Sequence, residues 1–186
     1  MAKVSDISRG SFVRYNGELA QVLEYEHRTP GNLRAFYQVK MRNLNSGKLI
    51  EQRFRPDDEM EIVRVHFKEQ QYLYMDGNNA VCMDNETFEQ IMIQKETIGE
   101  GVALMKEGMN IKIYFEGEEP IFAELPLTVE LEVTYTEPGM RGDTATRTLK
   151  AATLETGASI KVPLFINTGD KIRIDTRTNT YIERAK

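Results

Sequence analysis

Short stretches in which apolar and polar residues alternate recur along the whole chain, and turn residues separate most of them. The clearest stretch places apolar side chains at every second position: Val129, Leu131, Val133 and Tyr135. A period of two buries one face of a β-strand and leaves the other in water. The same region contains three further strand candidates: Ser159–Phe165, Lys171–Asp175 and Thr180–Arg184. This spacing indicates a small barrel of the OB type over residues 128–186.

The first 64 residues also predict a small β domain. Asn16-Gly17 is a strong hairpin signal, because both central residues of a type I′ turn need positive φ angles. The run Pro56-Asp57-Asp58 interrupts the alternation. The expected strands are Ser11–Tyr15, Glu18–Glu26, Ala35–Asn43 and Leu49–Phe54.

A loop over residues 28–34 joins the two long strands of this domain. About nine extended residues at roughly 3.3 Å each span on the order of 30 Å, so this hairpin can project well beyond a small barrel. Pro30-Gly31 suits the turn, and Leu33 is expected to be exposed. Arg28 and Arg34 give the tip a positive charge.

A middle domain is expected over residues 65–127, because Pro126 resists continued strand pairing. Its strand candidates are Val63–Tyr74, Ala80–Met83, Asn110–Phe115 and Pro120–Glu124. A short helix is predicted over Thr87–Gln94, with Asp84 or Asn85 as its N-cap. Phe88, Ile91 and Met92 would form the apolar face of this helix. The predicted fold class is therefore all-β, in three domains: residues 1–64, 65–127 and 128–186.

The apolar fraction of 40% and the charged fraction of 28% are typical of a soluble globular protein. The net charge of −5 is unevenly distributed. Residues 1–56 carry 10 basic and 5 acidic side chains, whereas residues 65–127 carry 4 basic and 12 acidic ones and no arginine. This distribution fits a protein that meets a polyanion with one part only. Chance clustering on solvated faces would give the same counts.

Side chains that could perform catalysis or hold a metal are sparse. Cys82 is the only cysteine and sits in an apolar run, so it is expected to be buried and unreactive. His27 and His66 have no neighbouring ligands at metal spacing. The chain has no P-loop, and the acidic pair Glu118-Glu119 is expected in a solvated turn. We therefore expect no enzyme activity, no cofactor and no metal.

The distribution of apolar residues also bears on location. No apolar run approaches the roughly 18 residues that a membrane-spanning helix needs. The polar N-terminus lacks the apolar core of a signal peptide. We expect a cytoplasmic protein without a membrane partner.

Several ordered segments resemble the elongation factor P family along essentially the whole chain. The most specific is residues 136–144, Thr-Glu-Pro-Gly-Met-Arg-Gly-Asp-Thr, which is similar to the signature of the family's C-terminal domain. The loop retains Pro30-Gly31 and Ala35-Phe36 at the family spacing. Further similar segments are residues 40–43, 83–90, 161–165 and 174–184.

The resemblance implies an N-terminal SH3-like (KOW) barrel followed by two OB-like barrels, in an L shape that resembles tRNA. It implies a translation elongation factor that binds both ribosomal subunits between the peptidyl and exit sites. There it would contact peptidyl-tRNA and ribosomal RNA as a monomer and stimulate peptide-bond formation at consecutive prolines. Proline reacts slowly because its ring restricts φ and its nitrogen is a hindered secondary amine.

The resemblance also implies roles for particular residues. The loop tip near the peptidyl-transferase centre would comprise Pro30, Gly31, Asn32, Leu33 and Arg34. Contacts to RNA and tRNA are expected from Arg28, Arg34, Arg42, Tyr181 and Arg184. The loop at the exit-site codon would contain Gly142, Asp143 and Thr144.

The loop apex departs from the family pattern. Many members carry a lysine or arginine there that is extended after translation, whereas alignment on Pro30-Gly31 and Ala35-Phe36 places Asn32 at that position. Asparagine accepts neither modification. Either the factor acts unmodified, which we favour, or Arg34 has taken over the basic role.

A general single-strand RNA-binding OB protein is the alternative function. Such a protein would present stacking aromatic side chains on an exposed strand face. Tyr135, Phe165 and Tyr181 are too dispersed to favour it over ribosome binding.

Overall fold

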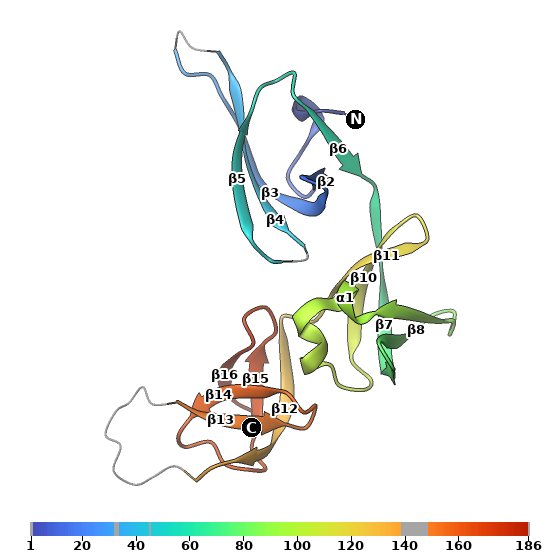
Figure 1. Ribbon diagram of the computed structural model, residues 1–186, viewed down its shortest axis with the longest axis vertical. Coiled ribbons are helices and arrows are strands. Elements are labelled where there is room, and N and C mark those ends of the chain that lie inside the picture. The colour runs from blue at the N-terminus through green and yellow to red at the C-terminus, as the bar shows by residue number, and fades with distance from the viewer. Residues whose placement is uncertain (1, 32–33, 45, 139–148, 186) are drawn as a thin grey trace. The chain divides into compact units, whose positions relative to one another are not determined.

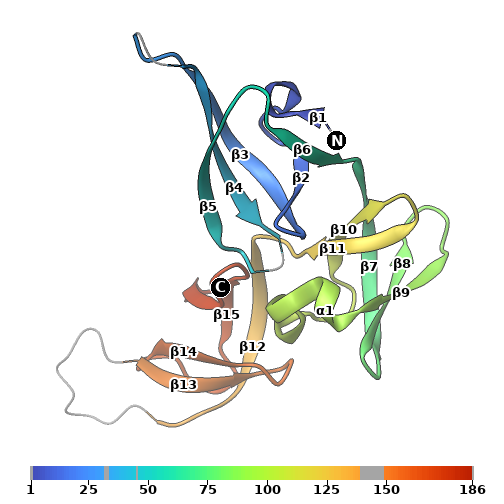
Figure 2. The same ribbon diagram turned by 45° about the horizontal axis from the view of Figure 1, so that its top comes forward.

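The computed structural model describes residues 2–31, 34–44, 46–138 and 149–185, and these residues form an all-β fold (Figures 1 and 2). The described strands make three sheets, with the orders β1-β6-β2-β3-β4-β5, β11-β10-β7-β8-β9 and β14-β13-β12-β15-β16. The predicted fold class is confirmed. The chain divides into two compact units, one of Met1–Phe67 with Tyr114–Phe122 and the other of Lys68–Ile113 with Ala123–Lys186. The domain boundaries and the L shape expected from the sequence stay predictions.

The first unit contains the six-stranded sheet. Asn16 and Gly17 have φ angles of 53° and 83°, as the predicted tight hairpin between β2 and β3 requires. Alternate residues of β3 and β4 are buried, and they pack with the 3₁₀ helix Val4–Asp6 into one core. The strands are β1 (Ala2–Lys3), β2 (Phe12–Tyr15), β3 (Glu18–Arg28), β4 (Phe36–Asn43), β5 (Leu49–Phe54) and β6 (Glu59–Val63).

Residues 114–122 belong to this first unit although they lie far along the chain. They include the facing ends of β10 (Asn110–Glu116) and β11 (Glu119–Glu124). The ring of Tyr114 lies 5.8 Å from that of Phe12, and Glu116 Oε2 accepts a 2.9 Å hydrogen bond from Arg14. Ile121 and Phe122 pack against a second small core of Leu19, Leu44 and Val63. Arg14 is thus held between two carboxylates at a partly exposed position, since Glu61 also lies 3.3 Å from its Nε.

The second unit contains the two five-stranded sheets, apart from the ends of β7, β10 and β11 that lie in the first. The 3₁₀ helix Gly99–Leu104 follows the short helix α1 (Lys95–Ile98), and it buries Leu104 in the core of the C-terminal sheet. Thr156 Oγ1 donates a 2.7 Å hydrogen bond to the Ala103 carbonyl. The remaining strands are β7 (Val65–Asp76), β8 (Asn79–Asp84), β9 (Gln90–Gln94), β12 (Thr128–Thr136), β13 (Leu149–Leu154), β14 (Ser159–Pro163), β15 (Lys171–Asp175) and β16 (Thr180–Arg184).

The helix predicted over Thr87–Gln94 is wrong. The expected capping residue Asp84 closes a turn instead, because its Oδ1 accepts hydrogen bonds from the backbone N–H groups of Glu86 and Thr87 at 2.8 and 3.1 Å. Phe88 then takes a φ of 61°, outside the helical region, and β9 pairs with β8. Ile93 is buried while Met92 is exposed, so the apolar run follows the period of a strand.

The other strand predictions differ from the structure mainly at their ends. Leu49–Phe54, Lys171–Asp175 and Thr180–Arg184 have the predicted bounds. Strand β14 ends at Pro163, and Phe165 is exposed. Strands β1, β6 and β13 were not predicted. None of the helices in the described part of the chain has the length and apolar character needed to cross a bilayer.

Candidate functional site

The β3–β4 hairpin is the candidate functional site because it carries the predicted loop tip. The two strands pair from Ala20↔Asn43 to Arg28↔Phe36 with one irregularity between Val22 and Glu24. Strand β3 has 11 residues, which at roughly 3.3 Å per residue gives a length of about 36 Å. Figures 1 and 2 show the hairpin continuing past the other strands of its sheet toward the tip.

One face of this hairpin carries stacked aromatic side chains. The rings of Tyr25 and Tyr37 lie 5.0 Å apart with an interplanar angle of 17°, and His27 lies 4.6 Å from Tyr37 at 28°. Tyr25 Oη donates a 2.9 Å hydrogen bond to the Val4 carbonyl, which ties the stack to the core of the domain. Burial is the main cause that raises the pKa of Tyr25 to about 12, and the neighbouring Tyr37 is the second cause. We call Tyr25, Tyr37 and His27 the aromatic stack.

The opposite face of the hairpin is charged. Arg28 pairs with Glu26 on the same strand at 2.7 Å, and Lys40 pairs with Glu24 across the strands at 3.1 Å. Phe36 lies opposite Arg28 in the ladder. The guanidinium carbon of Arg53, on β5, lies 5.1 Å from the centre of the Phe36 ring, which is cation–π geometry.

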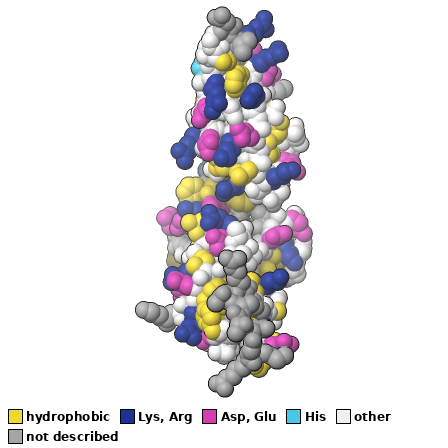
Figure 3. All heavy atoms as spheres, turned by 90° about the vertical axis from the view of Figure 1, so that its left-hand side faces the viewer, with side chains coloured by type: hydrophobic (Ala, Val, Ile, Leu, Met, Phe, Trp, Pro, Cys, Tyr) yellow, Lys and Arg dark blue, Asp and Glu magenta, His cyan; other side chains and the backbone are white. Residues whose placement is uncertain are grey.

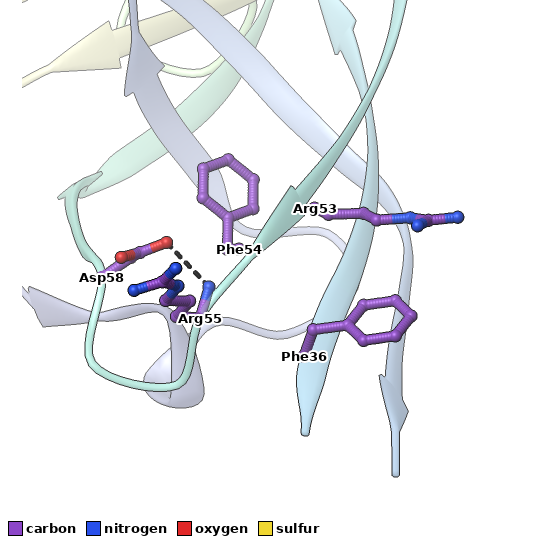
Figure 4. A pocket seen from close by; sticks show the side chains of 5 residues that line it. All are labelled: Phe36, Arg53, Phe54, Arg55 and Asp58. Atoms are coloured by element: carbon purple, nitrogen blue, oxygen red, sulfur yellow. Dashed lines mark hydrogen bonds between the residues drawn. The ribbon is translucent and has the colours of Figure 1, made fainter. Parts of the chain in front are cut away.

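A shallow hollow opens beside Phe36. It is lined by Phe36, Arg53, Phe54, Arg55 and Asp58. Figure 4 shows Phe36 and Arg53 on one side of this hollow and Arg55 with Asp58 on the other. Asp58 Oδ2 accepts a 2.7 Å hydrogen bond from the Arg55 backbone N–H, and the Asp58 N–H donates in turn to the Arg55 carbonyl at 3.1 Å. The Asp58 carboxylate is therefore hydrogen-bonded to the backbone of its own turn.

The arginines of the first unit differ in whether a carboxylate neutralises them. Arg14 and Arg28 are in ion pairs. Within the described ranges, by contrast, no carboxylate oxygen lies within 4.0 Å of a nitrogen of four others: Arg34, Arg42, Arg53 and Arg55. On the face drawn in Figure 3, basic side chains lie beside apolar ones near the end that carries the hairpin tip.

The predicted site residues are only partly brought together. Arg28, Pro30, Gly31 and Arg34 lie at the hairpin tip, whereas Arg42 lies opposite Gln21 at the other end of β4. Asn32 and Leu33 lie outside the described residues, and so do all three residues of the exit-site codon loop: Gly142, Asp143 and Thr144.

Two predicted contact residues lie in the C-terminal sheet. Tyr181 is half-buried and packs against the core of that sheet, where burial raises its pKa. Arg184 keeps an exposed side chain 4.0 Å from Asp170.

The sequence did not identify the group around Phe36. Phe36 and Arg53 are 17 positions apart in sequence, and only the β4–β5 register makes them neighbours. In the sequence, Phe36 shares alternate positions with Gln38, Lys40 and Arg42, which form the polar face of this strand. An aromatic residue on a polar strand face is the sequence signal that could have identified this group.

The described residues offer little for covalent chemistry. No group of three or more potential metal ligands occurs among them. Burial raises the pKa of the Cys82 thiol to about 11, so it is protonated at neutral pH. Each histidine stacks on an aromatic ring, His27 on Tyr37 and His66 on Phe115. The site is a projecting β-hairpin that carries positively charged and aromatic side chains.

Comparison with known proteins agrees with this arrangement. Residues 3–60 match the elongation factor P (EF-P) KOW-like domain, residues 65–123 match the EF-P OB domain, and residues 129–184 match the C-terminal domain of elongation factor P. The elongation factor P of Chloroherpeton thalassium is 50% identical over 187 residues, covering 100% of both chains. Those of Chloroflexus aggregans and Nocardia farcinica are 48% and 44% identical, covering 97% and 100% of this chain and 97% and 99% of their own. The chain belongs to the elongation factor P family.

Proposed function

We propose that this translation factor binds the ribosome between the peptidyl and exit sites and stimulates peptide-bond formation at consecutive prolines. Membership of the family makes the chain a translation elongation factor. The observation that carries the finer proposal is the β3–β4 hairpin, which holds a basic tip at the end of a long two-stranded support. The partners would be both ribosomal subunits, peptidyl-tRNA and ribosomal RNA.

The hairpin would act by positioning the tRNA. Ribosomal RNA performs the chemistry, so the factor needs no nucleophile or general base at its tip. Holding the acceptor end of peptidyl-tRNA in an attack-ready geometry removes part of the entropic barrier to peptide-bond formation. This gain in rate matters most when the reactants are slow. The attacking group is slow at a run of prolines, because its nitrogen is a hindered secondary amine.

The aromatic stack supports this role because it stiffens the hairpin. Tyr37 contacts both Tyr25 and His27, and the Tyr25 hydroxyl is tied to Val4. A flexible hairpin would lose much of its positioning effect to its own conformational entropy. The proposal is therefore a stiff hairpin that positions its tip, with Asn32 unmodified.

Other residues would place the factor on the ribosome. Arg34 and Arg42 have no carboxylate within ion-pair distance among the described residues, so their charges are available to phosphates. Tyr181, Arg184 and the loop of Gly142, Asp143 and Thr144 would act from the C-terminal domain, the loop at the exit-site codon. The factor is proposed to act as a monomer.

Directed hydroxyl-radical probing tests the binding site. An iron chelate attached to Asn32→Cys would be selective, because Cys82 is fully buried and its thiol pKa is raised. We expect strand cleavage in the ribosomal RNA of the peptidyl-transferase centre. The matched control is Glu118→Cys, an exposed position on the β10–β11 turn, which should cleave elsewhere. Identical cleavage patterns from both positions, or none from position 32, would contradict the proposed site.

A further inference from the structure

Phe36 lies among arginines on the outer face of the first unit. The ladder places Arg28 opposite it on β3, and Arg53 stacks over its ring at 5.1 Å. Arg55 follows Phe54 at the end of β5 and lines the same hollow, on the side opposite Phe36 (Figure 4). We call Phe36 with Arg28, Arg53 and Arg55 the Phe36 platform.

We propose that the Phe36 platform is a binding site for an unpaired RNA nucleotide, whose base stacks on Phe36 and Arg53 and whose phosphate is held by Arg55. This inference rests on the proposed function, and it adds a contact separate from the loop tip. The ligand class follows from the combination of an aromatic ring, a planar guanidinium and a second free cation around an open hollow.

The geometry favours a base over other ligands. Unpaired bases stack on aromatic rings and on arginine planes, and the guanidinium of Arg53 lies over the Phe36 ring, so the two groups together supply a stacking surface. The β3–β4 ladder includes Phe36, opposite Arg28, so the backbone that carries the ring is fixed before a ligand binds. A base inside a duplex has no free face, so single-stranded RNA fits this site and duplex RNA does not.

The charges around the hollow favour a phosphate. Arg53 and Arg55 are both exposed, and neither is in an ion pair with any carboxylate that the structure describes. The acidic residue of the hollow, Asp58, is engaged by the backbone N–H of Arg55. Arg28 contributes less, since Glu26 offsets its charge at 2.7 Å. The hollow is therefore positive on balance, and a guanidinium fork suits phosphate oxygens.

The test is a titration of the full chain with a single-stranded RNA hexamer that contains 2-aminopurine, whose fluorescence is quenched by stacking. We expect saturable quenching with the wild-type protein. Phe36→Leu should bind about tenfold more weakly, because one base stack is lost. Phe36→Tyr keeps a ring and should retain the quench, while Arg53→Gln and Arg55→Gln should each weaken binding and flatten its salt dependence by about one unit.

Lys40→Gln is the matched control. It removes one positive charge from the same sheet face, but Lys40 is already paired with Glu24 at 3.1 Å, so the quench should be unchanged. Circular dichroism of each variant identifies any loss of folding, and Arg53→Gln leaves every buried side chain in place.

Three outcomes would overturn the proposal: equal quenching by Phe36→Leu, equal affinity for a duplex of the same length, or equally strong competition by an acidic hexapeptide. Because no ribosome is present, a failure here is separate from a failure of wild-type protein to relieve stalling at prolines.

Discussion

Single arginines of the first unit differ in how much of their charge reaches solvent. Arg14 is held between Glu61 and Glu116, and the hydrogen bond to Glu61 is the main cause of its raised pKa. Arg28 is offset by Glu26. Arg34 and Arg42 have no such partner among the described residues. A count of basic residues therefore overstates the charge that RNA can meet.

This difference predicts a difference in salt dependence. Arg34→Ala and Arg42→Ala should each weaken ribosome binding and lower the slope of log affinity against log salt by about one unit, because each removes a phosphate contact and its released counterions. The measurement is sedimentation with ribosomes over a salt series. Reversing the charges of Glu118 and Glu119 is the control. If that reversal weakens binding more than Arg34→Ala does, the RNA face has been assigned to the wrong domain.

Cys82 predicts a pH dependence of stability. Burial raises the pKa of its thiol from 9.0 to about 11. The unfolded thiol ionises from about pH 9, so the stability gained by burying the neutral form is complete below that pH and is lost as the pH rises toward 11. The size of this loss is roughly 2 kcal/mol in the free energy of unfolding.

Urea unfolding below pH 9 and again near pH 11 measures this loss. The fall in unfolding free energy should be smaller in Cys82→Ala than in the wild type by about that amount, while contributions from Tyr25 and the lysines cancel in the comparison. Equal falls in the two proteins would show that the pKa of the Cys82 thiol is not raised in the folded protein.

At the scale of elements, strands with a clear alternation could be predicted and a short ambiguous run could not. Val129, Leu131 and Val133 are buried in β12 as their period of two required, whereas Tyr135, expected on the same face, is exposed because the strand register shifts between Val133 and Tyr135. The run around Ile91 and Met92 fits both a helix and a strand over so few residues, and the turn made by Asp84 decided between them. Side-chain hydrogen bonds of this kind are not visible in a hydrophobic pattern.

The same limit applies to the candidate site. The tip could be predicted because its Pro-Gly turn and flanking strands are contiguous in sequence. The aromatic stack and the Phe36 platform could not, since they depend on the register between strands. Register is set by turn geometry and by the buried face together, and a shift of one residue would put Phe36 inside the barrel.

If the aromatic stack stiffens the β3–β4 hairpin, loss of the stack should lower the stimulated rate more than it lowers ribosome binding. Tyr37→Leu removes both ring contacts while keeping an apolar side chain against the core. We expect ribosome binding to change less than twofold and the stimulated rate at consecutive prolines to fall about tenfold, because the tip is still present but less well positioned. Rapid-mixing kinetics of a proline-proline step gives both quantities. The opposite pattern, with affinity lost and the stimulated rate kept, would mean that Tyr37 contacts the ribosome instead.

The loop of the C-terminal domain predicts a loss of function without a loss of stability. Asp143 can accept hydrogen bonds from base amino groups, and Gly142 allows close backbone approach. Asp143→Ala should therefore reduce relief of stalling several-fold while the thermal midpoint stays nearly unchanged. A parallel fall in midpoint and activity would indicate that Asp143 only holds its own turn.

For the whole molecule, the charge distribution separates a basic N-terminal part from an acidic middle part. Residues 65–127 have 12 acidic and 4 basic side chains, so they are expected to face away from RNA. A general RNA-binding OB protein would bind free RNA and ribosomes with similar affinity. Family membership and the projecting hairpin favour the ribosome as the specific partner.

The unmodified tip is proposed to relieve stalling at consecutive prolines. The most direct measurement is full-length synthesis of a reporter with consecutive prolines in a reconstituted system, using protein whose intact mass equals that of its sequence. We predict that the wild-type chain restores synthesis and that a chain lacking Asn32 and Leu33 does not, although it still sediments with ribosomes. Full restoration by the shortened chain, or none by the unmodified wild type, would contradict this role of the tip.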